Sequence, residues 1–400
     1  MAFRETCAME ERIRMLSDYD TGAFSVTELS ERYGVSRETF YLWRERRLSG
    51  DAMWFQDHSH APRNIPGRTE ATMIERIVAL RHRFPHFGPK KLRFRLQLDS
   101  PELDWPALST IGDILARAGL VEKVRRQRRP IAQGAPAASV LSVNSEWCVD
   151  FKGWFRTRDG RRIDPLTVTD NASRYLLEVR ILRPNHEEVR PVFERLFRDF
   201  GLPDAVRSDN GPPFGSSGAG GLSRLSIWLL KLGVEPHFGR PASPQDNGRH
   251  ERMHRTLAEQ TTQPPALCAS EQQQRFDVFR QHFNEERPHE ALEQRPPARI
   301  WRPSSRPMPA RIDDPWYDAH HEVRRVHRSG EIRWRGESIF IGEALAGEVV
   351  GLAERDQGYH IVRFSHHDLG MIDPEKIFRR FGGNKGRMVP RCLAWAKPGV

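Results

Sequence analysis

Apolar residues recur at helical spacing, three and four positions apart, near the beginning of the chain. They predict one helix that ends near Tyr33 and a second over residues 37–46, with a Gly-Val-Ser turn between them. Ser36 can cap the second helix by accepting a hydrogen bond from its free backbone N–H groups. We therefore expect a helix-turn-helix DNA-binding domain over residues 1–60, with an ordinary helical hairpin as the alternative. The outward positions of the second helix, which would enter a major groove, are Arg37, Thr39, Tyr41 and Arg44.

A second helical pattern begins near Met73 and ends at Gly119. It predicts another DNA-binding domain over residues 61–120, and two adjacent helical domains would contact a longer stretch of DNA than one. Residues 121–140 then read as a basic linker rich in alanine and proline. We expect this linker to follow DNA phosphates, with a merely solvated charge run as the equal alternative. Its phosphate-binding candidates are Arg125, Arg126, Arg128 and Arg129.

Between residues 141 and 300 the pattern changes to short apolar runs, typical of strands, that alternate with amphipathic helices. The order is three strands, helix, strand, helix, strand, helix, which predicts an α/β layer sandwich. The predicted strands are 147–151, 166–169, 175–181, 205–209 and 234–238. Residues 211–221 are rich in glycine, and we expect them to form a mobile flap beside the functional site.

The last hundred residues separate into a linker and a β-rich segment. Residues 301–325 are rich in proline and predict a linker, whereas short strands with turns at Gly336 and at Asp356 predict a small β-barrel over residues 326–400. The expected fold class is therefore a multidomain protein with α-helical helix-turn-helix modules, a central α/β core and a C-terminal small β-barrel.

Charge narrows the class of partner. The 400 residues include 63 lysines and arginines against 53 acidic residues, a net charge of +10, with arginine in excess over lysine. This balance favours a polyanion such as double-stranded DNA, although a merely basic protein stays possible on charge alone. The 4 cysteines are far apart and form no pattern typical of disulfides or zinc sites. No apolar run approaches the length of about eighteen residues that spans a bilayer, so we expect no membrane partner and a cytoplasmic location.

Three acidic residues stand out by their contexts. Asp150 interrupts an apolar strand, Asp209 ends another strand at an Asn-Gly turn, and Glu251 falls in the first turns of a helix that begins near residue 247. Carboxylates that converge in a fold can hold two Mg²⁺ or Mn²⁺ ions for phosphoryl transfer. His254 follows Glu251 by three positions and Arg255 by four, so a cation on that helix face would guide a DNA phosphate to the metals.

Other ionisable residues compete for the same role. Asp164, Asp170 and Asp246 are rival carboxylates, and Asp170 is the most credible of them, but an Asx turn or a pair with Arg174 explains it at least as well. A separate histidine group near residue 320 lacks matching cysteines or spaced ligands, so solvent exposure or contact with nucleic acid is favoured over a metal site. The members of that group are His320, His321 and His327.

Several phrases of the sequence resemble the integrase-core, or DDE, transposases of bacterial insertion sequences, whose fold is similar to ribonuclease H and to retroviral integrases. The matching phrases are Trp147-Cys-Val-Asp-Phe, Thr169-Asp-Asn-Ala-Ser-Arg-Tyr, Ser208-Asp-Asn-Gly, Ser243-Pro-Gln-Asp-Asn-Gly-Arg-His-Glu-Arg and Phe283-Asn-Glu-Glu-Arg-Pro-His-Glu-Ala-Leu.

The resemblance implies that Asp150, Asp209 and Glu251 are the catalytic and metal-binding triad. It also implies that Asn210, Asn247 and Arg255 shape the site or contact DNA. The interval between the second and third acids is longer than usual for the family, and the zinc-binding module of retroviral integrases has no counterpart here.

These expectations combine into one function. A transposase of this kind would bind the terminal inverted repeats of a mobile element, cleave the 3′ ends in a metal-dependent reaction and join them to target DNA. Because two ends must be handled together, we expect a homodimer or tetramer on DNA, in the bacterial cytoplasm near the nucleoid. The alternatives are a catalytically silent DNA-binding regulator derived from a transposase and a ribonuclease-H-like nuclease that cuts without joining.

Overall fold

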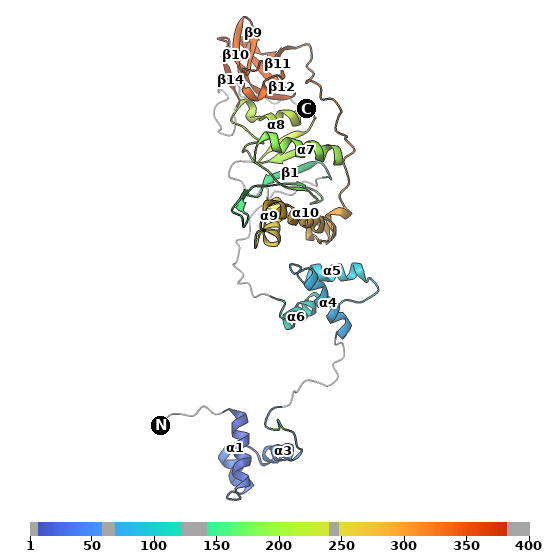
Figure 1. Cartoon of the computed structure of the whole chain (residues 1–400), viewed down its shortest axis with the longest axis vertical. Helices are drawn as coiled ribbons and strands as arrows, with labels where there is room; N and C mark the ends of the chain where they lie inside the picture. Colours follow the sequence, from blue (N-terminus) through green and yellow to red (C-terminus); the bar gives the residue numbers. More distant parts are fainter. Residues whose placement is uncertain (1–6, 58–68, 122–141, 240–247, 382–400) are drawn as a thin grey trace, which may run out of the picture. The chain divides into compact units, whose positions relative to one another are not determined.

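A computed structural model of the chain describes residues 7–57, 69–121, 142–239 and 248–381 (Figure 1). The chain divides into two compact units, residues 1–71 and 72–400. The first unit holds three helices, α1 (Ala8–Asp20), α2 (Val26–Tyr33) and α3 (Arg37–Leu48). Its small core consists of Met15, Leu16, Leu29, Phe40 and Trp43.

The predicted turn and cap of this first unit are present. Gly34 ends α2 with φ of 65°, a left-handed conformation that glycine adopts without steric cost. Ser36 then accepts a hydrogen bond from the backbone N–H of Thr39 at 3.1 Å and begins α3. The two predicted helices therefore exist with the predicted boundary, while their use as a DNA-reading module remains a prediction.

The second unit starts with another helical cluster. Helices α4 (Ala71–Arg83), α5 (Pro89–Asp99) and α6 (Leu108–Arg117) surround an apolar core that includes Ile77, Leu92 and Ile111. These helices fall inside the segment predicted to be helical.

A five-stranded mixed sheet forms the centre of the second unit, in the order β5-β4-β1-β6-β7. Strands β1 (Glu146–Phe151), β4 (Pro165–Asp170) and β5 (Leu176–Ile181) are antiparallel neighbours, and β6 (Ala205–Ser208) and β7 (Glu235–Phe238) continue the sheet in parallel from β1. All five correspond to predicted strands. The sequence analysis missed the hairpin of β2 (Phe155–Arg156) and β3 (Arg162–Ile163), whose strands have two residues each and no readable alternation.

Helices cover both faces of this sheet (Figure 1). On one face α7 (His186–Phe200) and α8 (Arg224–Lys231) pack against Trp147 and Val149 of β1. On the other face α9 (Gly248–Thr261) and α10 (Ala269–Glu285) pack against β5. The phenylalanine stripe of α10 is core, as its spacing indicates: Phe276, Phe279 and Phe283 are buried.

The C-terminal segment contains a second sheet, in the order β14-β13-β12-β11-β8, and a separate hairpin, β9-β10. Its strands are β8 (His321–Arg325), β9 (Glu331–Trp334), β10 (Glu337–Phe340), β11 (Val349–Glu354), β12 (His360–Phe364), β13 (His367–Ile372) and β14 (Phe378–Arg380). The sheet starts at His321, ahead of the predicted boundary at residue 326, because β8 pairs along β11. Strands are thus present where a barrel was expected, and the barrel itself remains a prediction.

The C-terminal sheet shares a hydrophobic core with the central unit. Ile227 and Leu230 on α8 join a buried cluster with Val350, Leu352 and Val362 of the C-terminal strands. Lys231, also on α8, donates to the carboxylate of Glu348 at 2.7 Å. The two sheets therefore form one packed body around α8.

The glycine-rich segment 211–221 has a defined conformation, which differs from the mobile flap expected. Phe214 is 3% exposed and packs in the core beneath the sheet, and its carbonyl accepts a hydrogen bond from Ser223 Oγ at 2.7 Å. Gly220 has φ of 63°, and a Cβ there would lie 3.2 Å from Leu369 of the C-terminal sheet. The glycines allow tight turns and close packing against β13, and they do not leave this loop without contacts.

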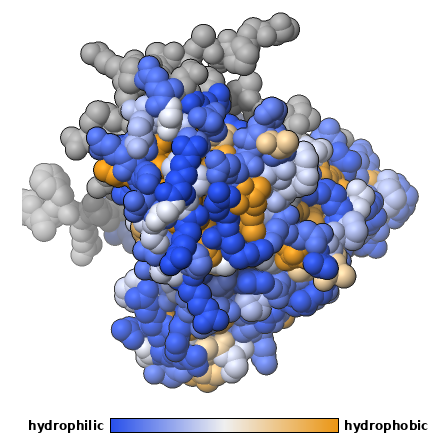
Figure 2. All heavy atoms as spheres, turned by 90° about the horizontal axis from the view of Figure 1, so that it is seen from above, coloured by the Kyte–Doolittle hydropathy of each residue, from blue (hydrophilic) through white to orange (hydrophobic). Residues whose placement is uncertain are grey.

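Hydrophilic side chains predominate on the face of the molecule seen in Figure 2, where hydrophobic ones form only small patches. Among the residues that the structure describes, no helix has the length and apolar character needed to span a bilayer.

Candidate active site

The parallel pairing of β1 and β6 aligns two of the predicted acids. Glu146 lies opposite Ala205, and Cys148 lies opposite Arg207. Asp150 lies two residues after Cys148 on β1, and Asp209 directly follows the last residue of β6, so the two acids lie near the same end of neighbouring strands, which are spaced about 4.8 Å apart. Because side chains alternate along a strand, Glu146, Cys148 and Asp150 share one face of β1. This is the face that α9 covers.

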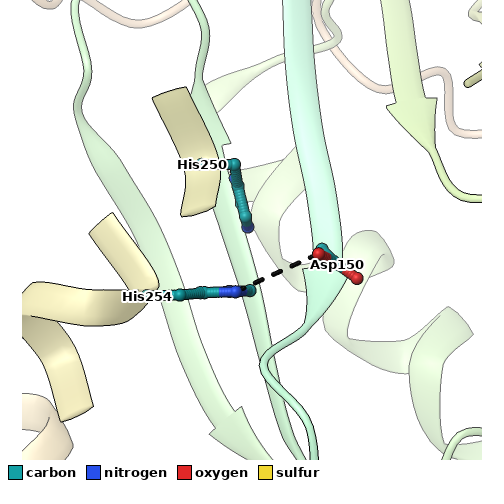
Figure 3. A group of neighbouring side chains, drawn as sticks. All are labelled: Asp150, His250 and His254. Carbon is teal, nitrogen blue, oxygen red and sulfur yellow. Dashed lines mark ion pairs between the residues drawn. The ribbon is translucent and has the colours of Figure 1, made fainter. Parts of the chain in front are cut away.

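Two histidines of α9 are hydrogen-bonded to the sheet beside Asp150 (Figure 3). The ring of His250 lies between two threonine hydroxyls of β4, with Nε2 2.7 Å from Thr167 Oγ1 and Nδ1 2.9 Å from Thr169 Oγ1. His254, one helical turn later, places Nε2 2.7 Å from Thr167 Oγ1 and Nδ1 4.0 Å from an Asp150 oxygen. Both contacts fix the rotation of α9 about its axis.

The hydrogen bonds of Thr167 determine which nitrogen of each ring carries the proton. Its hydroxyl donates to the Asp150 carbonyl oxygen at 3.0 Å, so it accepts from both histidines. Each ring is then protonated at Nε2 and leaves a lone pair on Nδ1. The lone pair of His250 accepts from Thr169, and that of His254 faces Asp150. Burial lowers the pKa of His254 to about 3, so this ring is neutral.

The acids repel one another. Burial, followed by the negative charge of Asp209 and, more weakly, that of Glu251, raises the pKa of Asp150 to about 7. Burial also raises the pKa of Asp209, against a hydrogen bond from the Gly211 backbone. The negative charges of Asp209 and Glu251 therefore both act on Asp150 at the carboxyl end of β1. A divalent cation placed among them would remove this repulsion.

Glu146, on the same face of β1, shows the opposite behaviour. Burial opposes its ionisation, but hydrogen bonds from His237, Arg207 and Asn171 lower its pKa to about 2. Arg207 donates two bonds of 2.9 Å to its carboxylate. Within the described part of the chain, β1 thus carries a fully hydrogen-bonded acid at its beginning and, at its end, an acid whose basic neighbour is the neutral His254.

The rival carboxylates have structural roles. Asp170 is fully buried, accepts from the backbone N–H of Asn144 at 2.8 Å and caps its own turn by accepting from the backbone N–H of Ser173, three residues on, at 2.7 Å, so it has a structural role in a local turn. Asp164 pairs with Arg162 at 3.1 Å. Asp246 lies outside the described residues.

The predicted DNA contacts fall into three groups. His254 differs from its prediction: its side chain is 12% exposed and neutral, because it packs under the sheet, and it is not a cation facing solvent. Asn210 donates from Nδ2 to the Gly239 carbonyl at 2.7 Å, whereas Arg255 is exposed on α9.

In α3, Arg37 and Tyr41 are exposed and Arg44 lies over the Tyr19 ring at 5.2 Å, while Thr39 is partly buried and bonds to Ser36. The candidates outside the described residues are Asn247, Arg125, Arg126, Arg128 and Arg129.

Sequence analysis missed the polar layer behind the acids. His250, Thr167 and Thr169 are buried, and their mutual hydrogen bonds attach α9 to β4. The available signal was the spacing of two histidines four positions apart on a helix that also carries a candidate acid. Lys152 was also missed; burial lowers its pKa, and its charge acts on His254.

Comparison with known proteins places this site in a family. The integrase core domain family matches residues 141–244 and again 232–297, and the C-terminal domain of IS481 family transposases matches residues 321–377. The chain belongs to the integrase-core transposases of bacterial insertion sequences. The central sheet is accordingly the integrase catalytic core, the domain of a polynucleotidyl transferase family whose members use divalent metal ions.

Relatives of this transposase agree with the assignment. A 39.2 kDa protein of insertion element IS476 from Xanthomonas euvesicatoria is 27% identical over 252 residues, 60% of this chain and 67% of the relative. A protein of insertion element IS407 from Burkholderia multivorans is 25% identical over 57% of this chain and 79% of the relative. The Gag-Pol polyprotein of baboon endogenous virus is 28% identical over 50% of this chain but only 11% of that polyprotein.

Solved structures similar to the transposase include retroviral integrases. The simian T-cell lymphotropic virus intasome matches 77% of this chain and 99% of that chain, with 16% identity and a TM-score of 0.35. The HTLV-2 integrase catalytic core in complex with magnesium matches 40% of this chain and 99% of that chain, with 14% identity and a TM-score of 0.32.

The residues present fit a hard divalent cation. Asp150 and Asp209 offer carboxylate oxygens at one sheet edge. Among the described residues, the basic side chain within 4.0 Å of the Asp150 carboxylate is that of His254, which is neutral and does not form an ion pair. Oxygen donors with room for water suit Mg²⁺.

Proposed function

We propose that this transposase cleaves the 3′ ends of its mobile element and joins them to target DNA, with Asp150, Asp209 and Glu251 as the metal-binding triad. The observation that carries the proposal is the position of Asp150 at the end of β1: it is largely buried beside Asp209, and burial and the charges of Asp209 and Glu251 raise its pKa, while within the described residues the basic group paired with it is the neutral His254. Structural acids of the same sheet, such as Glu146, are compensated.

The chain's own residues have distinct roles in this proposal. Asp150 and Asp209 present ligand oxygens from adjacent strands, and Glu251 adds a third from α9. Two divalent ions bound there, Mg²⁺ or Mn²⁺, would activate the attacking hydroxyl or water and stabilise the leaving oxygen of the phosphodiester. Asn210 ties the loop after β6 to the end of β7 and so holds the backbone beside Asp209.

Basic residues near the triad are suited to the DNA backbone. Arg255 is exposed four positions after Glu251, and Lys152 follows Asp150 by two positions on the way to the β2-β3 hairpin. Contacts of this kind position a substrate without reading its sequence. Arg255 and Lys152 are therefore proposed to hold the scissile phosphate, whereas His254 is proposed to hold α9 against β4 through Thr167.

We assign recognition of the element ends to the helical domains, residues 1–60 and 61–120, with residues 121–140 as the linker to the catalytic domain. What supports this assignment is that Arg37 and Tyr41 are exposed on α3, the second helix of the predicted helix-turn-helix. The catalytic domain spans residues 141–300 and the C-terminal domain residues 326–400, joined by the segment 301–325. A dimer or tetramer would hold two ends together.

The test is an in vitro reaction of the full chain with candidate end DNA, Mg²⁺ and a supercoiled target. We expect Asp150→Asn and Asp209→Asn each to reduce cleavage and joining by at least about a thousandfold, because each removes a charged metal ligand. Both variants should bind end DNA as tightly as the unchanged protein, measured by gel shift in EDTA. Asp199→Asn, an exposed acid on α7, is the matched control and should stay active.

The outcomes separate the candidate functions. Joining that is lost in both variants supports a transposase. Cleavage without joining by the unchanged protein would indicate a ribonuclease-H-like nuclease, and binding alone a regulator. Full activity of the double variant Asp150→Asn/Asp209→Asn would refute the triad.

A further inference from the structure

A second cluster of ligand-type side chains lies where the C-terminal sheet meets the catalytic core, on the opposite side of β6 from β1. Glu235 begins β7, His366 lies in the turn between β12 and β13, and His367 begins β13. His367 Nε2 lies 3.0 Å from one oxygen of Glu235, and His366 Nε2 contacts the other oxygen. All three ligand atoms lie within 4.8 Å of one another.

The backbone on both sides of this cluster is held in place. The N–H of Glu235 donates to the Asp204 carbonyl at 2.9 Å, which attaches the beginning of β7 to the core. Ser365 has φ of 52°, a left-handed conformation that turns both following histidines toward the same carboxylate. The Ser365 N–H donates to the Tyr317 hydroxyl at 3.1 Å, and that hydroxyl bonds to the Val349 carbonyl at 3.0 Å. The chelating geometry is thus set by the fold.

The three ligand groups suit a transition metal of intermediate softness, such as zinc. Two imidazoles and one carboxylate are a common zinc ligand set, and tetrahedral zinc with bonds of about 2.0–2.1 Å separates its ligand atoms by about 3.4 Å. Ser365 Oγ lies 3.1 Å from His366 Nδ1, so the second ring nitrogen of that histidine has the outer hydrogen-bond partner that metal-bound imidazoles usually have. The His366 side chain is 61% exposed, which leaves an entry path and room for water as a fourth ligand.

We propose that Glu235, His366 and His367 form a Zn²⁺-type metal site that cross-links the C-terminal sheet to β7 of the catalytic core. The site is separate from the triad and does not depend on the proposed function. Its consequence is mechanical: β7 pairs with β6, and β6 leads directly into Asp209, so a bound ion would stabilise the position of the C-terminal domain beside the strand that carries an active-site acid.

The test is titration of the full chain with Zn²⁺ by calorimetry in excess Mg²⁺, which satisfies oxygen sites but competes weakly for imidazole. We expect Glu235→Gln, His366→Ala and His367→Ala each to weaken Zn²⁺ binding at this site at least tenfold. Co²⁺ bound to the unchanged protein should give the intense visible absorption typical of tetrahedral coordination, and His367→Ala should lose it.

Two controls distinguish this site from other histidines and from the triad. His320→Ala removes an exposed histidine of the same segment and should leave binding unchanged. Asp150→Asn should also retain it, because the triad lies elsewhere. Hydrogen exchange should further show that Zn²⁺ slows exchange of β13 in the unchanged protein but not in His366→Ala/His367→Ala. Equal Zn²⁺ affinity of that double variant and the unchanged protein, or no Zn²⁺ binding by the unchanged protein in excess Mg²⁺, would overturn the proposal.

Discussion

Asp150→Asn should stabilise the metal-free protein even though it removes a proposed catalytic group. The folded protein raises the pKa of Asp150 from 3.8 to about 7, so it holds the ionised form less favourably than the unfolded chain does. The difference, at about 1.4 kcal/mol for each pH unit, amounts to about 4 kcal/mol. The side chain is 27% exposed, so solvent reduces this value, and we expect a gain of about 2–4 kcal/mol for the asparagine variant.

The sign of the pH dependence follows from linkage. For an acid whose pKa is raised on folding, the destabilisation is fully present above the folded pKa, here about 7, and disappears below the unfolded value of 3.8. The advantage of Asp150→Asn should therefore be largest at pH 8, decline as the pH falls through 7, and be nearly absent at pH 4.

Local stability is best measured by hydrogen exchange of peptides that span β1 and β6, in EDTA, because global unfolding of a multidomain chain is not two-state. Addition of Mg²⁺ should make the unchanged protein more stable than Asp150→Asn, since the ion stabilises only the protein that binds it. Asp199→Asn serves as the control and should change the stability of β1 and β6 neither in EDTA nor in Mg²⁺. A variant less stable than the unchanged protein at pH 8 in EDTA, or a difference independent of pH, would refute the reasoning.

Three further predictions concern the supports of the site. Thr167→Val should destabilise the core by about 2–4 kcal/mol, because two buried histidine N–H groups lose their acceptor, and hydrogen exchange of peptides that span β4 and α9, compared with Thr167→Ser, checks this. Gly201→Ala should cost more than Gly160→Ala in the same unit: both have positive φ, but a Cβ at Gly201 would lie 2.7 Å from the Ser304 carbonyl, whereas Gly160 has open space, so hydrogen exchange of the central sheet in the two variants isolates the clash. Asp170→Ala should lower the stability of the protein and, with it, the total activity of a preparation. The activity per folded molecule, measured after removal of aggregate, should stay near that of the unchanged protein.

The strands of the central sheet could be predicted from sequence because local patterns encode them. Predicted strands 147–151 and 205–209 differ by one residue from β1 and β6 at a single end. A charge inside an apolar strand, as at Asp150, is a local anomaly that needs no tertiary information. The local turn at Asp170 was likewise accessible from its neighbours.

Tertiary contacts decided the features that sequence reasoning missed. The partner of His254 is Thr167, 87 residues earlier, so nothing near the histidine indicates that it is buried and neutral. The glycine-rich loop looked mobile because its composition is flexible, yet Phe214 and Leu222 anchor it in two different cores. The pairing of Glu235 with the two histidines of the C-terminal turn joins positions more than a hundred residues apart.

The position of the third acid, Glu251, depends on the rotation of α9 about its axis. Two anchors set the rotation of α9: His250 and His254 bond to the threonines of β4, and Met253 and Leu257 pack with Leu176 of β5. Each further residue turns about 100° around a helix axis, so Glu251, one position after His250, projects from the edge of the buried face. From there its charge reaches Asp150 while its side chain stays exposed. Since these anchors belong to the sheet that carries Asp150, the position of Glu251 relative to that acid follows from the packing of α9 against the sheet.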